Sequence, residues 1–169
     1  MNSENSINNV QNLIEGIEYD IEQDTFTFNF KSDSGTEMIY TSYFGNVKKI
    51  LEEVPDAGLI SIAGKTPDWF KGEKFKPLMP HYGWLREWHD TFEGSLDSKE
   101  SREWYIDKYN KTVLSSLDPL PTARALKELV DWKPTFILCY ETPEKFCHRH
   151  IVAKWFNNYH IPCEEWKAI

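Results

Sequence analysis

The earliest strong pattern along the chain is an alternation of polar and aromatic residues. Residues 25–30 read TFTFNF, which places the three phenylalanines on one face of a strand. Residues 37–41 resume as a strand after the turn-forming cluster 31–35. The two strands predict a hairpin-like extension that leads into the main sheet. The polar, Asn- and Ser-rich residues 1–12 predict a frayed end or a short helix that extends as far as Ile14.

A strand, a helix and a second strand are predicted in succession between residues 41 and 63. Residues 47–54 carry apolar side chains at spacings of three and four, which is one face of a short amphipathic helix. Asn46 suits the position that caps this helix. Residues 58–63, GLISIA, form a short apolar run of the kind that parallel sheets bury on both faces.

The segment 64–96 is predicted to be a long irregular loop rich in Pro, Trp, Gly and Lys. Two interpretations of its basic and aromatic side chains are open: they bind an anionic or planar ligand, or they pack on the surface of the domain. The side chains concerned are Lys65, Trp69, Lys71, Lys74, Lys76, His81, Trp84, Arg86 and Trp88.

Two helices are predicted to follow this loop. Asp97 and Glu100 have the spacing of a capping box, which would begin a helix that extends to about Leu117. Residues 118–121, DPLP, end that helix. The next helix carries three apolar side chains inward, namely Leu126, Leu129 and Val130.

The clearest pattern lies between residues 134 and 159. Residues 135–139 form an apolar run that predicts a buried strand, residues 140–145 predict a polar turn, and a helix begins at Cys147. The apolar face of this helix is formed by Val152, Trp155, Phe156 and Tyr159. Residues 160–166 predict a last, edge-like strand.

Together these elements predict an α/β fold, a single domain with a mainly parallel, open, Rossmann-like sheet flanked by helices. Residues 37–169 would form this domain, and residues 1–36 would form an N-terminal β-hairpin-like extension with one or two strands. A chain of 169 residues of which 40% are hydrophobic suits one well-packed core.

Composition narrows the classes of function. The 19 basic and 27 acidic residues give a formal charge of −8, which disfavours extended binding to nucleic acid. We expect no membrane partner, because no apolar run is long enough to span a bilayer. Three cysteines, an odd number, and an N-terminus without an apolar signal segment predict a reducing, cytoplasmic location.

Candidate chemistry gathers where the strand at 135–139 passes into the following helix. A helix N-terminus favours anions and lowers the pKa of a nearby thiol, so Cys147 is the candidate nucleophile. His148 would act as its base and Arg149 as an anion clamp. Glu141 would orient one of these two side chains.

Ligands of open parallel sheets bind beyond the carboxyl ends of the strands. For this reason Tyr43, Asn46 and Cys139 are further candidate ligand-binding residues. The sequence leaves open whether Cys139 or Cys147 faces the cleft.

Zinc is an alternative for part of this region. Six potential ligands occur within 25 residues, but their spacing fits no zinc finger, and we expect no metal and no other cofactor. The six are Cys139, Cys147, His148, His150, His160 and Cys163. Of these, His150 is expected to face solvent.

From about residue 38 to its end, the chain resembles the uncharacterised bacterial and phage family catalogued as domain of unknown function 488. The motifs that carry the resemblance are TSYFGN (41–46), SIA (61–63), LMP (78–80), LDP (117–119), LCYE (138–141) and CHRHIVAKWF (147–156). The resemblance implies an α/β fold with Glu141, Cys147, His148 and Arg149 as its functional centre. The first 35 residues look like an extension beyond that family's usual start.

Two weaker similarities concern chemistry. A strand that ends in Cys139 and leads through a loop to Arg149 is similar to the anion-binding loop of rhodaneses and Cys-based phosphatases, but the nine intervening residues exceed the short loops of those families. The Cys-His-Arg run at 147–149 is similar to the acceptor-cysteine motif of DNA alkyltransferases, although Phe146 stands where those proteins have proline.

The leading hypothesis is thiol-dependent chemistry on, or binding of, an anionic small molecule such as a nucleotide. Two alternatives stay open. One is a non-enzymatic protein-binding or regulatory module, related to phage or host defence, whose protein partner would contact Trp69 or Trp84. The other is a factor for nucleic-acid repair or modification, which would require a basic cleft within the acidic surface.

Overall fold

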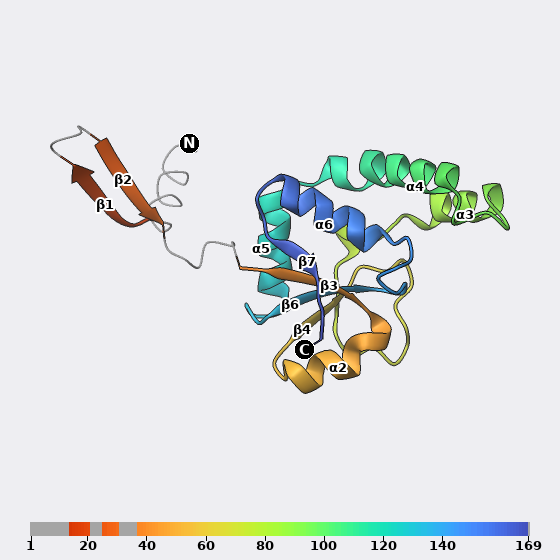
Figure 1. Ribbon diagram of the computed structural model, residues 1–169, viewed down its shortest axis with the longest axis horizontal. Coiled ribbons are helices and arrows are strands. Elements are labelled where there is room, and N and C mark those ends of the chain that lie inside the picture. Colours follow the sequence, from red (N-terminus) through yellow and green to blue (C-terminus); the bar gives the residue numbers. More distant parts are fainter. Residues whose placement is uncertain (1–13, 21–24, 31–36, 169) are drawn as a thin grey trace, which may run out of the picture. The chain divides into compact units, whose positions relative to one another are not determined.

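The computed structural model describes residues 14–20, 25–30 and 37–168 (Figure 1). Contacts divide the chain into two compact units, residues 1–36 and residues 37–169. Side chains are described from residue 37 onward. None of the described helices is both long enough and apolar enough to cross a membrane.

The first unit contains two antiparallel strands, β1 (Ile14–Asp20) and β2 (Thr25–Phe30). The predicted hairpin-like extension is therefore present, and the alternating segment is one of its strands. Its partner was predicted wrongly, because β2 pairs with β1 and not with the segment 37–41. That segment instead enters the sheet of the second unit, where two parallel neighbours satisfy its backbone. The predicted helix in residues 1–12 and the turn at 31–35 lie outside the described residues.

The second unit is built on a five-stranded, all-parallel sheet with the strand order β5-β4-β6-β3-β7. The strands are β3 (Ile39–Tyr43), β4 (Gly58–Ser61), β5 (Glu73–Lys74), β6 (Thr135–Cys139) and β7 (Cys163–Glu165). The predicted open parallel sheet is confirmed. All five residues of β6, the central strand, are buried, as its apolar run predicts for a strand covered on both faces. The last strand lies at an edge, as expected.

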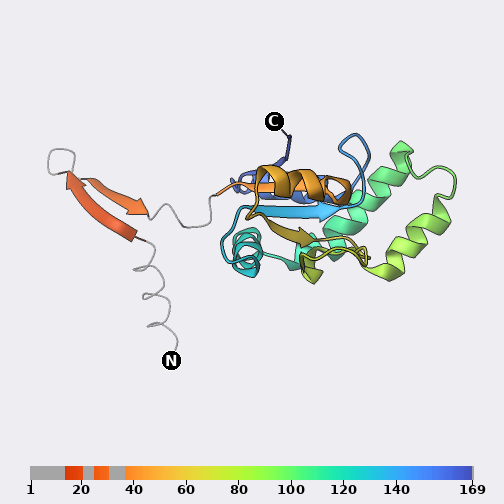
Figure 2. The ribbon, with the colours of Figure 1, turned by 90° about the horizontal axis from the view of Figure 1, so that it is seen from below.

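Helices cover both faces of this sheet (Figure 2). They are α2 (Val47–Glu53), α3 (Tyr82–Thr91), α4 (Lys99–Thr112), α5 (Pro119–Leu129) and α6 (His148–Asn158), with short 3₁₀ turns at Phe44–Asn46, Lys76–Leu78 and Leu114–Ser116. One apolar cluster joins the sheet to residues of α3, α4, α5 and α6, and a second joins it to α2 on the opposite face. The flanked α/β domain is thus confirmed.

Three local predictions need correction. The predicted loop 64–96 contains α3, because Trp84, Leu85 and Trp88 have the spacing of an inward helical face and pack against the main cluster. Ser98, one residue after Asp97, caps α4, and its hydroxyl oxygen accepts a hydrogen bond from the Ser101 N–H at 3.2 Å.

Leu129 was also predicted wrongly. Leu126 and Val130 are buried as expected, but Leu129 ends α5 with its side chain 37% exposed. Residues three to four apart share a helix face. Leu129 is three residues after Leu126, so the spacing predicted an inward position, but Leu129 is the last residue of α5 and its side chain stays partly exposed.

Replacement of Gly58 by a residue with a side chain should destabilise the fold. An alanine Cβ at Gly58 would lie 2.4 Å from Val130 Cβ, since β4 passes directly over the end of α5. We expect Gly58→Ala to lower the free energy of unfolding by about 1–3 kcal/mol, as measured by urea denaturation. Gly83→Ala is the matched control, because a Cβ there meets nothing within 4 Å, and it should be neutral or slightly stabilising. Equal effects of the two substitutions would contradict this packing.

Candidate functional site

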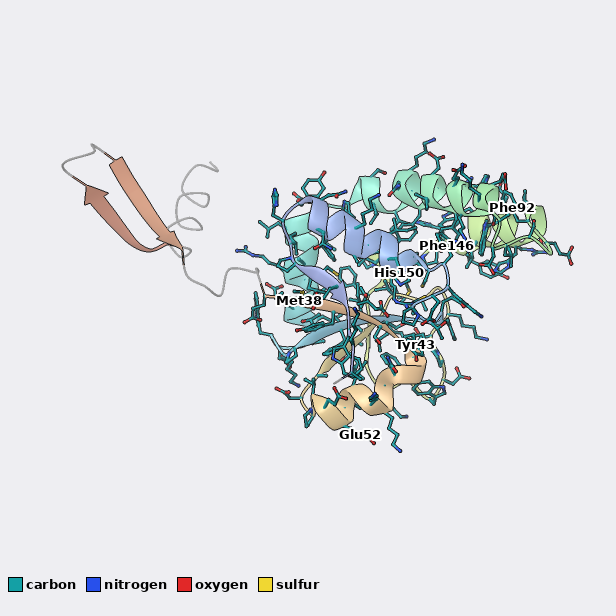
Figure 3. All side chains as sticks on the ribbon, viewed as in Figure 1. Met38, Tyr43, Glu52, Phe92, Phe146 and His150 are labelled. Atoms are coloured by element: carbon teal, nitrogen blue, oxygen red, sulfur yellow. The ribbon has the colours of Figure 1, made fainter. Side chains whose placement is uncertain are left out.

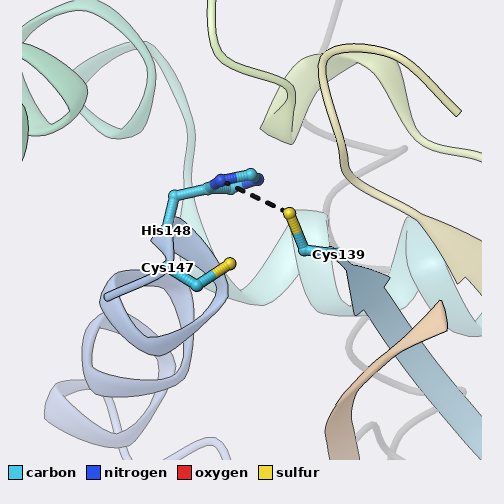
Figure 4. A group of neighbouring side chains, drawn as sticks. All are labelled: Cys139, Cys147 and His148. Atoms are coloured by element: carbon cyan, nitrogen blue, oxygen red, sulfur yellow. Dashed lines mark hydrogen bonds between the residues drawn. The ribbon is translucent and has the colours of Figure 1, made fainter. Parts of the chain in front are cut away.

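Two thiols and an imidazole meet where β6 ends and α6 begins. Cys139 is the last residue of β6, Cys147 is the N-cap of α6, and His148 is the first residue of that helix. β6 and α6 are held in place by their buried apolar residues, so the polar loop between them returns the chain to the strand end. The two sulfur atoms and the imidazole nitrogen lie within 4.8 Å of one another. Figure 4 shows the three side chains pointing toward a common centre.

The His148 ring is fixed by hydrogen bonds on both sides. Its Nε2 lies 2.8 Å from the carbonyl oxygen of Ile62, which can only accept, so Nε2 carries a proton. In the neutral ring Nδ1 is then an acceptor, and it lies 3.4 Å from the Tyr105 hydroxyl and 3.8 Å from Cys139 Sγ. The basic nitrogen of His148 therefore faces the thiol pair.

The two thiols have opposite electrostatic environments. The hydrogen bond that Cys139 donates to Cys147 is the largest influence on Cys147 and lowers its pKa; burial opposes this, and the positive charge of Arg149 adds to it. The same hydrogen bond and burial raise the pKa of Cys139. These directions favour Cys147 as the thiolate of the pair and Cys139 as the thiol that donates to it.

Arg149 is completely buried and bound on every side by the protein. Its Nε and Nη2 each lie 3.1 Å from a carboxylate oxygen of Glu165 on β7, and its Nη1 donates to the carbonyl oxygen of Glu141. The sequence predicted that Arg149 binds an anionic ligand. In the structure its guanidinium binds these two acceptors of the protein itself. Its positive charge still acts on the site, because it lowers the pKa of Cys147.

Glu165 holds Arg149 in place behind the site, a role that the sequence did not reveal. Burial by itself would raise its pKa, but hydrogen bonds from His150, Arg149 and Thr41 outweigh this and lower the pKa to about 2. The Thr41 hydroxyl donates to the carboxylate at 2.6 Å. His150, expected to face solvent, is partly exposed, with Nε2 3.6 Å from Glu165. No local pattern marks Glu165, since its partners come from β3 and α6.

A cavity of about 440 Å³ opens above the thiols. Of the candidates from the sequence, it brings together Cys139, Glu141, Cys147 and His148. Its other lining residues come from the segments 63–65, 80–97, Tyr105, Tyr140 and 145–146. The volume lies within the range of small-molecule sites. Both thiols therefore face the same pocket. The sequence had left open which of the two does so.

Tyr43 and Asn46 do not line this pocket. In Figure 3 Tyr43 lies at the α2 end of β3, whereas Phe146 lies beside α6. Asn46 is at the N-cap of α2, but its Nδ2 donates to Ser42 Oγ at 3.2 Å. Their predicted role in ligand binding has no support from the pocket geometry.

Glu141 makes contacts at the site through both its backbone and its side chain. Its carbonyl oxygen accepts from Arg149, while a carboxylate oxygen lies 3.8 Å from Lys145 Nζ at the pocket. The predicted link between Glu141 and Arg149 therefore exists through the main chain.

The cluster could also hold a soft metal ion. Cys139, Cys147 and His148 are zinc-ligand types at suitable mutual distances, but a tetrahedral site needs four ligands, and no further Cys, His, Asp or Glu joins the group among the described residues. His150, His160 and Cys163, the other three potential ligands, are not members of this group.

The tryptophans of the segment 64–96 divide between two roles. Trp84 is buried in the main apolar cluster and Trp88 lines the pocket, whereas Trp69 is exposed beside Phe44. The packing interpretation therefore holds for Trp84, whereas ligand binding by the segment stays a prediction. A partner protein could not contact Trp84 without disruption of the core.

Comparison with known proteins identifies a family. The model of DUF488-N3a, described as the active DUF488-N3 subclade, matches residues 59–160, which is more than half of the chain. The matched region contains β4, β6, α6 and all three members of the Cys-His cluster. No curated protein and no solved structure matches the chain.

Proposed function

The chain belongs to the DUF488-N3a family, and from the site within the matched region we propose that it is a thiol-dependent enzyme acting on an anionic small molecule such as a nucleotide. One observation carries the proposal: Cys139, Cys147 and His148 converge at an open pocket of about 440 Å³. A buried structural cysteine would not need a donor thiol, an oriented imidazole and access to a cavity.

In the proposed reaction Cys147 Sγ attacks an electrophilic centre of the bound molecule: a bond to sulfur forms, the bond from that centre to its leaving group breaks, and the leaving group departs with the electron pair. Cys139 donates its S–H to the thiolate before attack and so keeps Cys147 ionised. When Cys139 gives up its proton, His148 Nδ1, which lies 3.8 Å from Cys139 Sγ, accepts it. The carbonyl of Ile62 keeps the ring in the tautomer that leaves Nδ1 unprotonated.

The walls of the pocket support a planar, anionic substrate. Trp88, Tyr140 and Phe146 offer aromatic surface on which a flat ring can stack. The Trp88 ring is held in place, because its Nε1 donates to Ser101 Oγ at 2.8 Å. Lys65 supplies the cation, since its exposed side chain forms no ion pair or hydrogen bond with any residue that the structure describes.

The role of Lys65 can be tested without knowledge of the substrate, by using AMP to protect Cys147 from iodoacetamide. We expect Lys65→Met to weaken protection by about tenfold, because it removes one charge-assisted contact to the phosphate. Lys49→Met, which removes an exposed lysine of α2, should leave protection unchanged. Protection of the Lys65 variant at wild-type AMP concentrations would contradict this role, and absence of protection in the wild type would exclude AMP-like ligands.

A further inference from the structure

Cys139 and Cys147 have the arrangement of an oxidisable pair. They flank one loop, residues 140–146, and their sulfur atoms are within 4.8 Å of each other. Both side chains are buried from bulk solvent yet line the pocket, so a molecule as small as hydrogen peroxide can reach them. Among the described residues, no other cysteine belongs to this group.

We propose that Cys147 is a site of oxidation by hydrogen peroxide and that Cys139 then forms a disulfide with it, which reversibly removes the nucleophile. The inhibitory consequence rests on the proposed function, whereas the oxidation itself does not. The pocket that would admit the substrate also admits the oxidant.

The first step is attack of Cys147 Sγ on one oxygen of the peroxide. An S–O bond forms, the O–O bond breaks, and hydroxide leaves and is protonated to water. Cys147 becomes a sulfenic acid and the peroxide is reduced by two electrons. This step requires an ionised sulfur that faces the pocket, and Cys147 meets both conditions.

The second step is attack of Cys139 Sγ on the sulfur of the sulfenic acid. The S–S bond forms, the S–O bond breaks, and the departing hydroxide takes up the thiol proton and leaves as water. His148 Nδ1, 3.8 Å from Cys139 Sγ, is placed to receive that proton on the way. In total two thiols and one peroxide give one disulfide and two waters.

Formation of the bond requires the sulfurs to approach to about 2.05 Å. The loop that joins them can adjust, since residues 143–145 are exposed. Cys147 precedes the first residue of α6, so that its movement disturbs at most the bond from the His150 N–H to the Cys147 carbonyl, at the very start of the helix.

Cys163 is the internal control. It is buried in the apolar cluster on the α6 face and is not part of the Cys-His group. It should therefore take no part in the oxidation, although it is as buried as the other two cysteines.

The experiment treats the reduced full-length protein with equimolar hydrogen peroxide, blocks free thiols and maps tryptic peptides without reduction. Trypsin cleaves after Lys145, between the two cysteines, so the disulfide appears as a cross-linked peptide that dithiothreitol releases. We expect this peptide in the wild type and in Cys163→Ser. In Cys139→Ser we expect none: one equivalent of peroxide leaves Cys147 as sulfenic acid, and a second equivalent converts it to sulfinic acid.

Three results would overturn the inference: sulfinic acid at Cys147 in the wild type, a cross-link to Cys163, or unmodified cysteines. Labelling of the reduced protein with iodoacetamide at pH 6 distinguishes failure of the disulfide inference from failure of the proposed function. A Cys147 that labels at pH 6 but forms no disulfide refutes the inference alone. A disulfide without such labelling refutes the proposed function alone.

Discussion

Replacement of Glu165 by alanine should lower the free energy of unfolding by about 3–5 kcal/mol, because it leaves a buried arginine without its counter-charge. Arg149 is fully buried, and two of its nitrogens bond to this carboxylate at 3.1 Å. Among the residues that the structure describes, the carbonyl of Glu141 is then the one acceptor left to Arg149. The change is measured by urea denaturation followed by circular dichroism.

The matched control is Glu164→Ala on the same strand. Glu164 is exposed, so its loss should change the free energy of unfolding by less than about 0.5 kcal/mol. A second variant, Arg149→Met combined with Glu165→Ala, should recover part of the stability, since no unpaired charge then stays buried. Equal stability of the Glu165 and Glu164 variants would show that Arg149 finds another partner.

The difference between the wild type and Glu165→Ala should also depend on pH. The pKa of Glu165 is about 2 in the folded protein, against about 4.3 in an unfolded chain. Its contribution is therefore fully present above about pH 4.3 and is lost as the pH falls toward 2. A difference that stays constant between pH 6 and pH 3 would contradict the low pKa.

Replacement of Cys139 by alanine should raise the pH midpoint of iodoacetamide labelling at Cys147 by about one to two units. The hydrogen bond from Cys139 is the largest cause of the low pKa of Cys147. A hydrogen bond to a charged group contributes about 1.5–3 kcal/mol, which corresponds to one or two pKa units. At a pH below the pKa, each of these units reduces the thiolate fraction tenfold.

Cys163→Ala provides the comparison for this second prediction. Burial raises the pKa of Cys163 to about 12, and this residue does not contact the pair, so its removal should leave the labelling rate of Cys147 unchanged. At pH 10 the rates of the wild type and Cys139→Ala should converge, because Cys147 is then ionised in both. A Cys139→Ala variant whose labelling midpoint equals that of the wild type would assign the low pKa to the helix N-terminus and Arg149 alone.

The parts of the site that were predictable lie close together in sequence. The buried run of β6 and the helical spacing of α6 are local signals, and they place Cys139, Cys147 and His148 at one junction without knowledge of the rest of the fold. The prediction of a parallel sheet likewise followed from apolar runs typical of strands buried on both faces.

The predictions that failed concern residues whose positions depend on contacts between distant segments of the chain. Glu165 joins the site only because β7 pairs with β3 beside α6, and nothing in its own neighbourhood indicates this. The argument from strand ends included Tyr43 as a candidate, but the chain turns there into a 3₁₀ helix that packs Phe44 on the α2 side. Spacing can place a residue at the end of a strand, but the side of the sheet on which the pocket opens depends on the packed helices.

The most direct test of the thiolate is the pH dependence of iodoacetamide labelling at each cysteine of the native protein, quantified by peptide mass spectrometry. We predict that Cys147 labels with a midpoint far below 8.5, the ordinary thiol pKa, while Cys139 and Cys163, whose pKa values are raised, stay unlabelled near neutral pH. Labelling should disappear in Cys147→Ser. If Cys147 instead reacts only at or above pH 8.5, or only after unfolding, it is a structural cysteine and the proposed function is wrong.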